Sequence, residues 1–361
     1  MAITLFNSNE NSNTNENPSL SLHELGWKPF FQQQLTLDEW EDAVPARVIG
    51  LHRSIIVVQT EDKRLTLPVL PDMTGITVGD WLLVNHDDHF CRLLERQSLF
   101  ARKAAGSKVN SQSIAANVDT VFIVSSLNSD FNLNRLERFL ALANEAGAEP
   151  VVVLTKADLC ADPQDYIRQV QAIDSMLMVE AVNALDASSV NALASWCTTG
   201  KTVAFLGSSG VGKSTLVNTL LNKAEQVTGT IREDDSKGRH TTTARSLHPM
   251  PSGSLLLDTP GMRELQLADC EQGVEETFAD ISRLARSCQF SDCQHSGEPG
   301  CAIASALELG QLDTRRLNNY RKLMREQALN SATLAQKRAR DKSLSRLYRS
   351  VQGESRRRKK G

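Results

Sequence analysis

The chain has 361 residues, of which 40% are hydrophobic and 23% are charged, and its formal net charge at pH 7 is −3. This length allows two or three domains, each with a core of its own, and the composition is that of an ordinary globular protein. No apolar run approaches the ~20 residues of a membrane-spanning helix, so we expect no membrane partner.

The first residues and the cysteines predict the compartment. Residues 1–20 are rich in Asn and Ser and contain neither Lys nor Arg nor an apolar core, so they do not resemble a signal peptide. The chain has seven cysteines, three of them close to one histidine. This favours a metal site in a reducing compartment over a set of disulfides. We therefore expect a cytoplasmic protein.

Residues 1–42 are expected to be an N-terminal extension, partly disordered, with a short helix within 21–42. Residues 43–100 contain short alternating strands separated by turn residues, which predicts a small β-barrel. A barrel of the OB-fold type that binds RNA is favoured. Another small all-β module, such as an SH3-like barrel, fits the same pattern.

Residues 105–268 alternate between apolar strands and amphipathic stretches. The predicted strands lie at 121–126, 150–155, 177–182, 202–207 and 254–259. Continuous Val, Ile and Leu strands that alternate with helices predict an α/β domain, with a mostly parallel sheet covered on both faces.

Two motifs after successive strands predict recognition of guanine. The first, close to the [N/T]KxD element of guanine-nucleotide proteins, consists of Thr155, Lys156, Ala157 and Asp158. The carboxylate of Asp158 can accept hydrogen bonds from both N1–H and the N2 amino group of guanine, whereas adenine presents an acceptor there. The aliphatic stem of Lys156 can cover the base, and Thr155 stands where Asn is commoner. Asn183 and Ala184 are positioned for a backbone contact with guanine O6.

The strongest motif is a phosphate-binding loop of the pattern G-x-x-x-x-G-K-[ST], between an apolar strand and an amphipathic helix. Its residues, with the first one after it, are Gly207, Ser208, Ser209, Gly210, Val211, Gly212, Lys213, Ser214 and Thr215. Backbone N–H groups of such a loop and the start of the helix bind phosphate oxygens. Lys213 is expected to reach the β- and γ-phosphates, and the Ser214 hydroxyl is expected to ligate Mg²⁺.

The segment that follows carries the expected switch residues. Asp258 ends an apolar strand and is placed to hold Mg²⁺, and the N–H of Gly261 can sense the γ-phosphate. Thr241 or Thr242 is expected to contact Mg²⁺, and His240 is a candidate for positioning water or a solvated loop histidine. Met262 occupies the position of the Gln that orients water in Ras-like proteins.

The order of these motifs is unusual, because the base motif precedes the phosphate loop and the DTPG element comes last. Such an order is compatible with an unchanged sheet if the chain is circularly permuted, since the termini of domains lie at the surface and often close together. The permutation leads the DTPG segment directly into the C-terminal region.

Residues 275–345 are expected to be a mostly helical domain with a zinc site, and residues 346–361 a basic disordered tail. The candidate ligands form the pattern C-x₄-C-x-H-x₅-C and are Cys288, Cys293, His295 and Cys301. Three thiolates and one imidazole suit one closed, structural Zn²⁺ site per chain. The alternative is a group of buried thiols beside a surface histidine.

Charge is distributed unevenly along the chain. Residues 315–361 contain sixteen Lys or Arg and three acidic residues, a net charge of +13, so the remainder carries −16. A basic end on an acidic body favours an anionic partner such as nucleic acid, although it also fits a solvated tail.

These features together resemble the ribosome small-subunit-dependent GTPase A family (RsgA, also called YjeQ). The resemblance rests on the barrel, the order TKAD, GSSGVGKS, GRHTTT and DTPG, and the Cys/His pattern, over about residues 44–345. It implies an OB domain, a permuted GTPase domain and a zinc domain. It implies GTP hydrolysis in late maturation of the small ribosomal subunit (30S), stimulated by the subunit, with contacts to its rRNA. We expect GTP and GDP as ligands and a monomeric protein.

Two other functions fit parts of the sequence. The first is an RNA-binding assembly factor in which hydrolysis is vestigial and the nucleotide only sets conformation. The second is a phosphate-loop ATPase or kinase, which competition of GTP by ATP would reveal.

Overall fold

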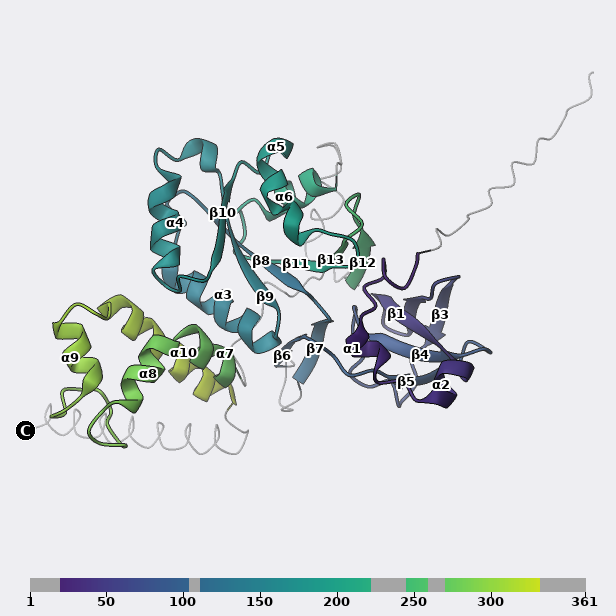
Figure 1. Ribbon diagram of the computed structural model, residues 1–361, viewed down its shortest axis with the longest axis horizontal. Coiled ribbons are helices and arrows are strands. Elements are labelled where there is room, and N and C mark those ends of the chain that lie inside the picture. Colours follow the sequence, from purple (N-terminus) through teal and green to yellow (C-terminus); the bar gives the residue numbers. More distant parts are fainter. Residues whose placement is uncertain (1–19, 104–110, 222–244, 259–269, 332–361) are drawn as a thin grey trace, which may run out of the picture.

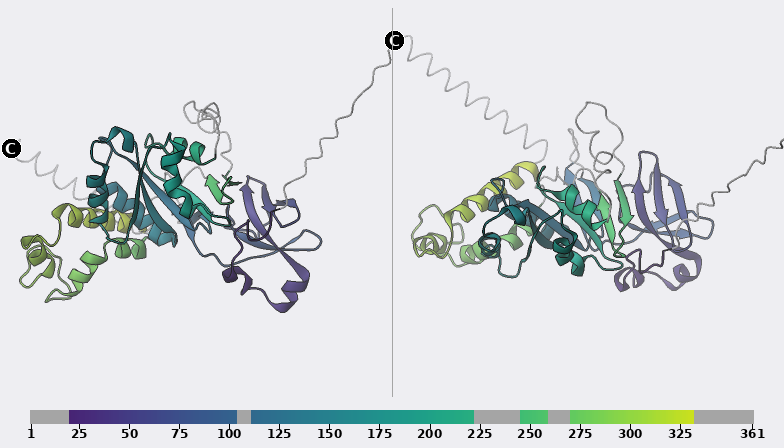
Figure 2. Two further views of the ribbon diagram at one scale, coloured as in Figure 1. Left: turned by 45° about the horizontal axis from the view of Figure 1, so that its top comes forward. Right: turned by 90° about the horizontal axis from the view of Figure 1, so that it is seen from above.

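The computed structural model describes residues 20–103, 111–221, 245–258 and 270–331. Figure 1 shows β-strands at one end of the molecule, a helix-covered sheet in the middle and a group of helices at the other end. The two turned views of Figure 2 keep the same order. Within the described ranges, no helix is both long enough and apolar enough to cross a membrane.

The first described segment packs on the strands that follow it. It contains the short helices α1 (Pro29–Gln32) and α2 (Leu37–Asp42), in agreement with the helix expected in this stretch. α2 begins at a capping box, because the Thr36 side chain accepts from the backbone of Glu39 while the Glu39 side chain accepts from that of Thr36. Phe31 is buried against Trp81 of these strands, with ring centroids 5.8 Å apart.

Five antiparallel strands follow, with the order β3-β2-β1-β4-β5. Their bounds are β1 (Ala43–Leu51), β2 (Ile55–Gln59), β3 (Arg64–Pro68), β4 (Trp81–Asn85) and β5 (Phe90–Leu93). Alternate residues such as Val48, Ile56 and Leu82 point to a common apolar core, which is the period-2 pattern expected of strands with one buried face. A hairpin that the sequence did not predict, β6 (Leu99–Lys103) and β7 (Ser111–Ala116), leads into the central sheet.

The central sheet confirms the predicted α/β core. Its strands lie in the order β10 (Met178–Val182), β9 (Glu149–Thr155), β8 (Thr120–Ser126), β11 (Thr202–Leu206), β13 (Leu255–Asp258) and β12 (Arg245–Pro249). The first five are parallel and β12 is antiparallel to β13. β8 is buried along its whole length, as continuous apolar strands of a sheet covered on both faces should be.

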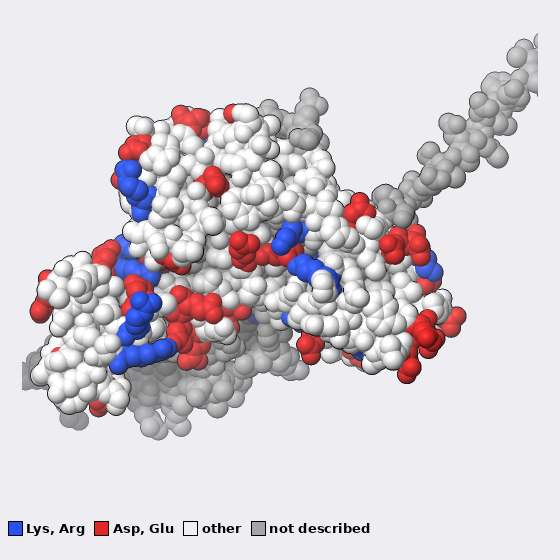
Figure 3. All heavy atoms as spheres, in the orientation of Figure 1, with Lys and Arg blue, Asp and Glu red and all other residues white. Residues whose placement is uncertain are grey.

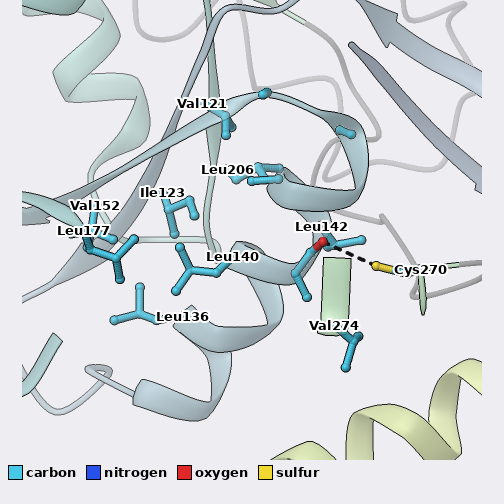
Figure 4. Close-up of a cluster of buried hydrophobic side chains, with 14 of the residues drawn as sticks. Val121, Ile123, Leu136, Leu140, Leu142, Val152, Leu177, Leu206, Cys270 and Val274 are labelled. Carbon is cyan, nitrogen blue, oxygen red and sulfur yellow. Dashed lines mark hydrogen bonds between the residues drawn. The ribbon is translucent and has the colours of Figure 1, made fainter. Parts of the chain in front are cut away.

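Two apolar clusters cover the opposite faces of this sheet. The covering helices are α3 (Leu133–Ala146) and α4 (Pro163–Gln171) on one face, and α5 (Ala187–Val190) and α6 (Lys213–Leu220) on the other, with 3₁₀ turns at Ala157–Leu159 and Asn191–Trp196. Val121 and Ile123 of β8 belong to the cluster on the α3 face (Figure 4), while Phe122 and Val124 belong to the other.

The sheet continues into the antiparallel strands β1 to β5. β12 pairs with β1, with Gly50 opposite Ser246 and Leu51 opposite Arg245. The buried Arg47 of β1 adds a second link, because its guanidinium donates to the Thr202 hydroxyl of β11 at 3.1 Å and to backbone carbonyls on both sides. Burial lowers the pKa of Arg47 to about 10, which leaves the side chain charged at neutral pH.

Four helices complete the described chain, in agreement with the mostly helical C-terminal region that the sequence predicts. They are α7 (Glu271–Thr277), α8 (Ala279–Arg286), α9 (Ala302–Glu308) and α10 (Thr314–Ser331). α7 approaches α3 closely at Gly273, where a Cβ atom would lie 2.1 Å from the carbonyl oxygen of Ala141. Burial raises the pKa of Cys270 to about 12, so its thiol stays protonated and donates to the same carbonyl (Figure 4).

A polar cluster joins α10 to α3. The carboxylate of Glu137 on α3 is inaccessible to solvent and accepts hydrogen bonds from Arg315 and Arg316 at 2.9–3.0 Å and from Asn319. Nearer to the surface, the guanidinium of Arg138 pairs with both carboxylate oxygens of Glu326 at 2.6 Å. α3 is therefore held between the central sheet and the C-terminal helices.

Candidate nucleotide and metal sites

The phosphate loop lies between the end of β11 and the start of α6. The backbone has positive φ at its three glycines, 147° at Gly207, 80° at Gly210 and 90° at Gly212. At Gly207 a Cβ atom would lie only 2.4 Å from the carbonyl oxygen of Val124, so only glycine fits there. The chain thus turns sharply and enters α6 with Lys213 as the first helical residue.

Lys213 and Ser214 lie at the centre of this loop. The buried ammonium of Lys213 donates to the carbonyl oxygen of Gly207 at 2.7 Å and to that of Ser208. The hydroxyl oxygen of Ser214 is buried and finds no hydrogen-bond partner among the described residues. A buried hydroxyl without a partner destabilises a fold by about 1–3 kcal/mol. A hard cation would satisfy this oxygen, so the site fits Mg²⁺.

Asp258 lies at the same edge of the sheet. It is the last residue of β13, which runs parallel to β11 and pairs directly with it. The carboxyl ends of parallel neighbours meet at one edge, so this half-buried carboxylate and the phosphate loop follow adjacent strands. Four other predicted site residues lie outside the described part of the chain: His240, Thr241, Thr242 and Gly261.

The base motif is hydrogen-bonded to the phosphate loop. Thr155 ends β9 and is fully buried, and its hydroxyl lies 2.6 Å from the carbonyl oxygen of Val211, to which it donates. The ammonium of Lys156, a residue with φ of 61°, donates to the carbonyl of Gly210 at 3.4 Å. Asp158 lies exposed in the following 3₁₀ turn, where a ligand can reach it. Thr155 thus has a partner that its place in the motif did not reveal.

The second base element is attached to α6. The carbonyl oxygen of the buried Ala184 accepts a hydrogen bond of 2.6 Å from the Thr219 hydroxyl. The side-chain oxygen of Asn183 accepts from the backbone N–H of Leu185, and the Asn183 N–H donates to Ser189. The loops after β9 and β10 are therefore both bonded to the phosphate loop or its helix.

Sequence reasoning missed one residue beside the loop. Arg135, in the first turn of α3, donates to the Ser208 hydroxyl at 2.8 Å. No motif includes an arginine 73 positions before the serine that it contacts, and the pairing follows only from the packing of α3 on β8 and β9.

The four predicted metal ligands lie together. One ligand atom from each of Cys288, Cys293, His295 and Cys301 falls within 4.8 Å of all the others. The Nδ1 atom of His295 lies 3.5 and 3.6 Å from the sulfurs of Cys288 and Cys301, which are 4.0 Å apart. A tetrahedral zinc site requires about 3.6 Å between nitrogen and sulfur and about 3.8 Å between sulfurs. The donor set fits a tetrahedral ion.

The pKa values of two thiols in the cluster shift in opposite directions: that of Cys288 is lowered, whereas burial raises that of Cys293 to about 12. Burial opposes ionisation of the Cys288 thiol, but backbone N–H groups of Ala302 and Ile303 at the start of α9 outweigh it and lower the pKa of Cys288. Thiolate is the form that coordinates a metal ion. The start of α9, which follows the Cys/His cluster, thus favours ionisation of Cys288, the first ligand of the cluster.

Comparisons with known proteins agree with this geometry. The family model described as RsgA GTPase matches residues 93–268. A Vibrio parahaemolyticus protein named small ribosomal subunit biogenesis GTPase RsgA 2 is 60% identical over 337 residues, which cover 93% of this chain and 94% of the relative. A Mesorhizobium japonicum protein named small ribosomal subunit biogenesis GTPase RsgA is 47% identical and covers 87% and 92% of the two chains.

Two solved structures share the fold. YjeQ from Thermotoga maritima has a TM-score of 0.59 at 26% identity and covers 79% of this chain and 98% of its own. YloQ, described as a circularly permuted GTPase, has a TM-score of 0.55 at 26% identity and covers 79% and 94%. The resemblance found in the motifs is confirmed: the chain belongs to the RsgA GTPase family and is a GTP-hydrolysing enzyme.

Proposed function

We propose that this chain hydrolyses GTP during maturation of the small ribosomal subunit and that the subunit stimulates hydrolysis. The observation that carries the proposal is the joined nucleotide site, in which Thr155 of the base motif is bonded to the phosphate loop. The names of the two relatives refer to biogenesis of the small subunit. We extend that role to this chain.

The residues of the site divide the chemistry between them. Lys213 neutralises charge that develops on the transferred phosphoryl group, and Ser214 with Asp258 holds Mg²⁺. The unpartnered Ser214 hydroxyl supports this assignment. Magnesium, when bound, would offset the negative charge of the phosphates. We propose the predicted roles for Thr241, Thr242 and Gly261 at the metal and γ-phosphate, and for His240 beside the attacking water.

Guanine is recognised by the loops after β9 and β10. Asp158 accepts from the Watson–Crick edge of the base, Lys156 covers its face, and Ala184 lies in the loop that faces O6. The exposure of Asp158 and the anchoring of Ala184 to α6 support these roles. The Asp158→Asn variant should lose GTP affinity and gain xanthine-nucleotide affinity, because one acceptor becomes a donor.

The Cys/His cluster is proposed to hold one structural zinc ion. Four ligands would fill a tetrahedral zinc site and leave no position for a substrate, and the four ligand atoms lie within 4.8 Å of one another. Metal analysis of protein purified without chelator should find about one zinc per chain, and the Cys288→Ser variant should lose most of it. Zinc-free wild-type protein with an intact, folded C-terminal region would exclude this assignment.

The barrel and the basic C-terminal end are proposed to contact rRNA. The order β3-β2-β1-β4-β5 around one core supports an OB-type barrel, and we propose domain boundaries at 43–100, 105–268 and 275–345. Figure 3 shows acidic side chains at the barrel end, where α2 carries four acids in six residues, and both basic and acidic side chains over the C-terminal helices. The basic excess lies in the sequence of residues 315–361, which carries a net charge of +13. Charge therefore favours the C-terminal end as the stronger phosphate-binding surface. We propose a cytoplasmic monomer.

The test is GTP turnover of the full-length protein with purified small subunits, with large subunits and alone. We expect small subunits to stimulate turnover and large subunits to have no effect. The Lys213→Ala variant should be inactive in every mixture. Deletion of residues 332–361, which leaves α10 and its bonds to Glu137 in place, should weaken stimulation in a salt-dependent way. Equal turnover with and without subunits would contradict the proposal.

A further inference from the structure

Arg135 lies where α3 meets the phosphate loop. It belongs to the first turn of the helix, and its backbone N–H donates to the Asn132 side chain that caps α3. One terminal nitrogen of its guanidinium lies 2.8 Å from the Ser208 hydroxyl oxygen and 2.8 and 2.9 Å from the two carboxylate oxygens of Asp130. The carboxylate thus orients the arginine toward the loop.

Ser208 is held from two sides. Its hydroxyl accepts from Arg135 outside the loop, and its backbone carbonyl accepts from the Lys213 ammonium inside. A shift of this residue moves the carbonyl that orients Lys213. Arg135 therefore reaches the catalytic ammonium through one intervening residue.

We propose that Arg135 is a positioning residue for GTP hydrolysis, which acts through Ser208 to hold the ammonium of Lys213 in its working orientation. The proposal rests on the GTPase activity assigned above. The helix that carries Arg135 is itself fixed, because Glu137 and Arg138 bind residues of α10. The phosphate loop is thus anchored through Arg135 to α3, a helix whose position is fixed by its contacts with α10.

The effect on rate should be separable from an effect on folding. The side chains of Arg135 and Asp130 are 36% and 40% exposed, and ion pairs so exposed contribute little to stability. A small displacement of a catalytic group, in contrast, lowers the rate strongly. Ground-state binding is shared with the backbone N–H groups of the loop and with the base motif, so KM should change less than kcat.

The experiment compares Arg135→Ala, Arg135→Lys, Ser208→Ala and the double alanine variant in full-length protein. We expect kcat to fall about tenfold in Arg135→Ala, with KM changed less than about threefold and an unaltered melting temperature. Arg135→Lys should restore most of the rate, because an ammonium can also donate to the Ser208 hydroxyl. The double variant should be no slower than Arg135→Ala, because both changes remove the same contact.

The matched control is Arg168→Ala on α4, which removes an arginine that is 65% exposed and pairs with Asp165 at 3.3 Å. It should leave kcat unchanged. The inference is wrong if Arg135→Ala keeps kcat within about twofold of wild type, or if the two alanine effects multiply. Wild-type protein that hydrolysed no more GTP than Lys213→Ala would instead refute the GTPase assignment, so the two failures are distinguishable.

Discussion

Replacement of Thr155 by valine tests whether the base motif holds the shape of the phosphate loop. The two side chains have nearly the same volume, so the fully buried position stays filled. The substitution removes only the hydroxyl that donates to Val211 at 2.6 Å, with a second acceptor, the carbonyl of Ser125, at 3.3 Å. The loop carbonyl then remains buried without this donor.

The magnitude follows from that single lost donor. Leaving a buried carbonyl unpaired destabilises the folded state by about 1–3 kcal/mol. Without the bond the loop samples other conformations, and nucleotide binding must restore the competent one. Because about 1.4 kcal/mol corresponds to a tenfold change in an equilibrium constant, we expect GTP affinity to fall about tenfold.

The assay is titration with a fluorescent GTP analogue, accompanied by thermal unfolding. Thr155→Ser is the matched control, because it keeps the hydroxyl and loses only a methyl group. We expect the serine variant to bind nearly as well as wild type and the valine variant about tenfold more weakly. If valine binds like wild type, or if serine is the weaker of the two, the hydroxyl does not hold the loop.

Three further predictions concern stability. Glu137→Gln should lower the free energy of unfolding by about 3 kcal/mol, because it removes the buried negative charge that faces Arg315 and Arg316, and Arg316 then keeps only its pair with Asp280. Glu326→Gln, at a partly exposed pair, should lower it by less than about 1 kcal/mol. Urea unfolding of both variants measures the contrast, and equal losses would contradict it. Gly273→Ala should destabilise the protein by about 1–3 kcal/mol, because the new methyl group overlaps a backbone carbonyl of α3, and an unchanged melting temperature would show that α7 can move away freely. Hydrogen bonds from Arg92 lower the pKa of Glu39 to about 2 from 4.5. The stabilisation from this ion pair is therefore complete above about pH 4.5 and is lost as the pH falls toward 2. Glu39→Gln should flatten the pH dependence of the free energy of unfolding in that window, and parallel curves for variant and wild type would refute the stabilising role of Glu39.

The sequence by itself predicted the features that are local in the chain. A phosphate loop needs glycines, a lysine and a hydroxyl at fixed spacing, so eight consecutive residues identify it. The parallel sheet follows from apolar strands that alternate with helices, and the described strands begin and end within two residues of the predicted ones. Four candidate ligands within fourteen residues likewise predict a metal site, and the fold brings one ligand atom of each within 4.8 Å of the others.

Only the tertiary structure decided how these local features are joined. The contacts between Arg135 and Ser208, between Glu137 and Arg315, and between β1 and β12 join residues 73 to about 200 positions apart. No periodicity or spacing encodes such pairs, because they arise when separate elements pack against each other. Thr155 shows the difference within one motif. Its sequence position indicates guanine recognition, whereas the fold shows its hydroxyl bonded to the phosphate loop, because parallel strands of one sheet bring their carboxyl ends to the same edge.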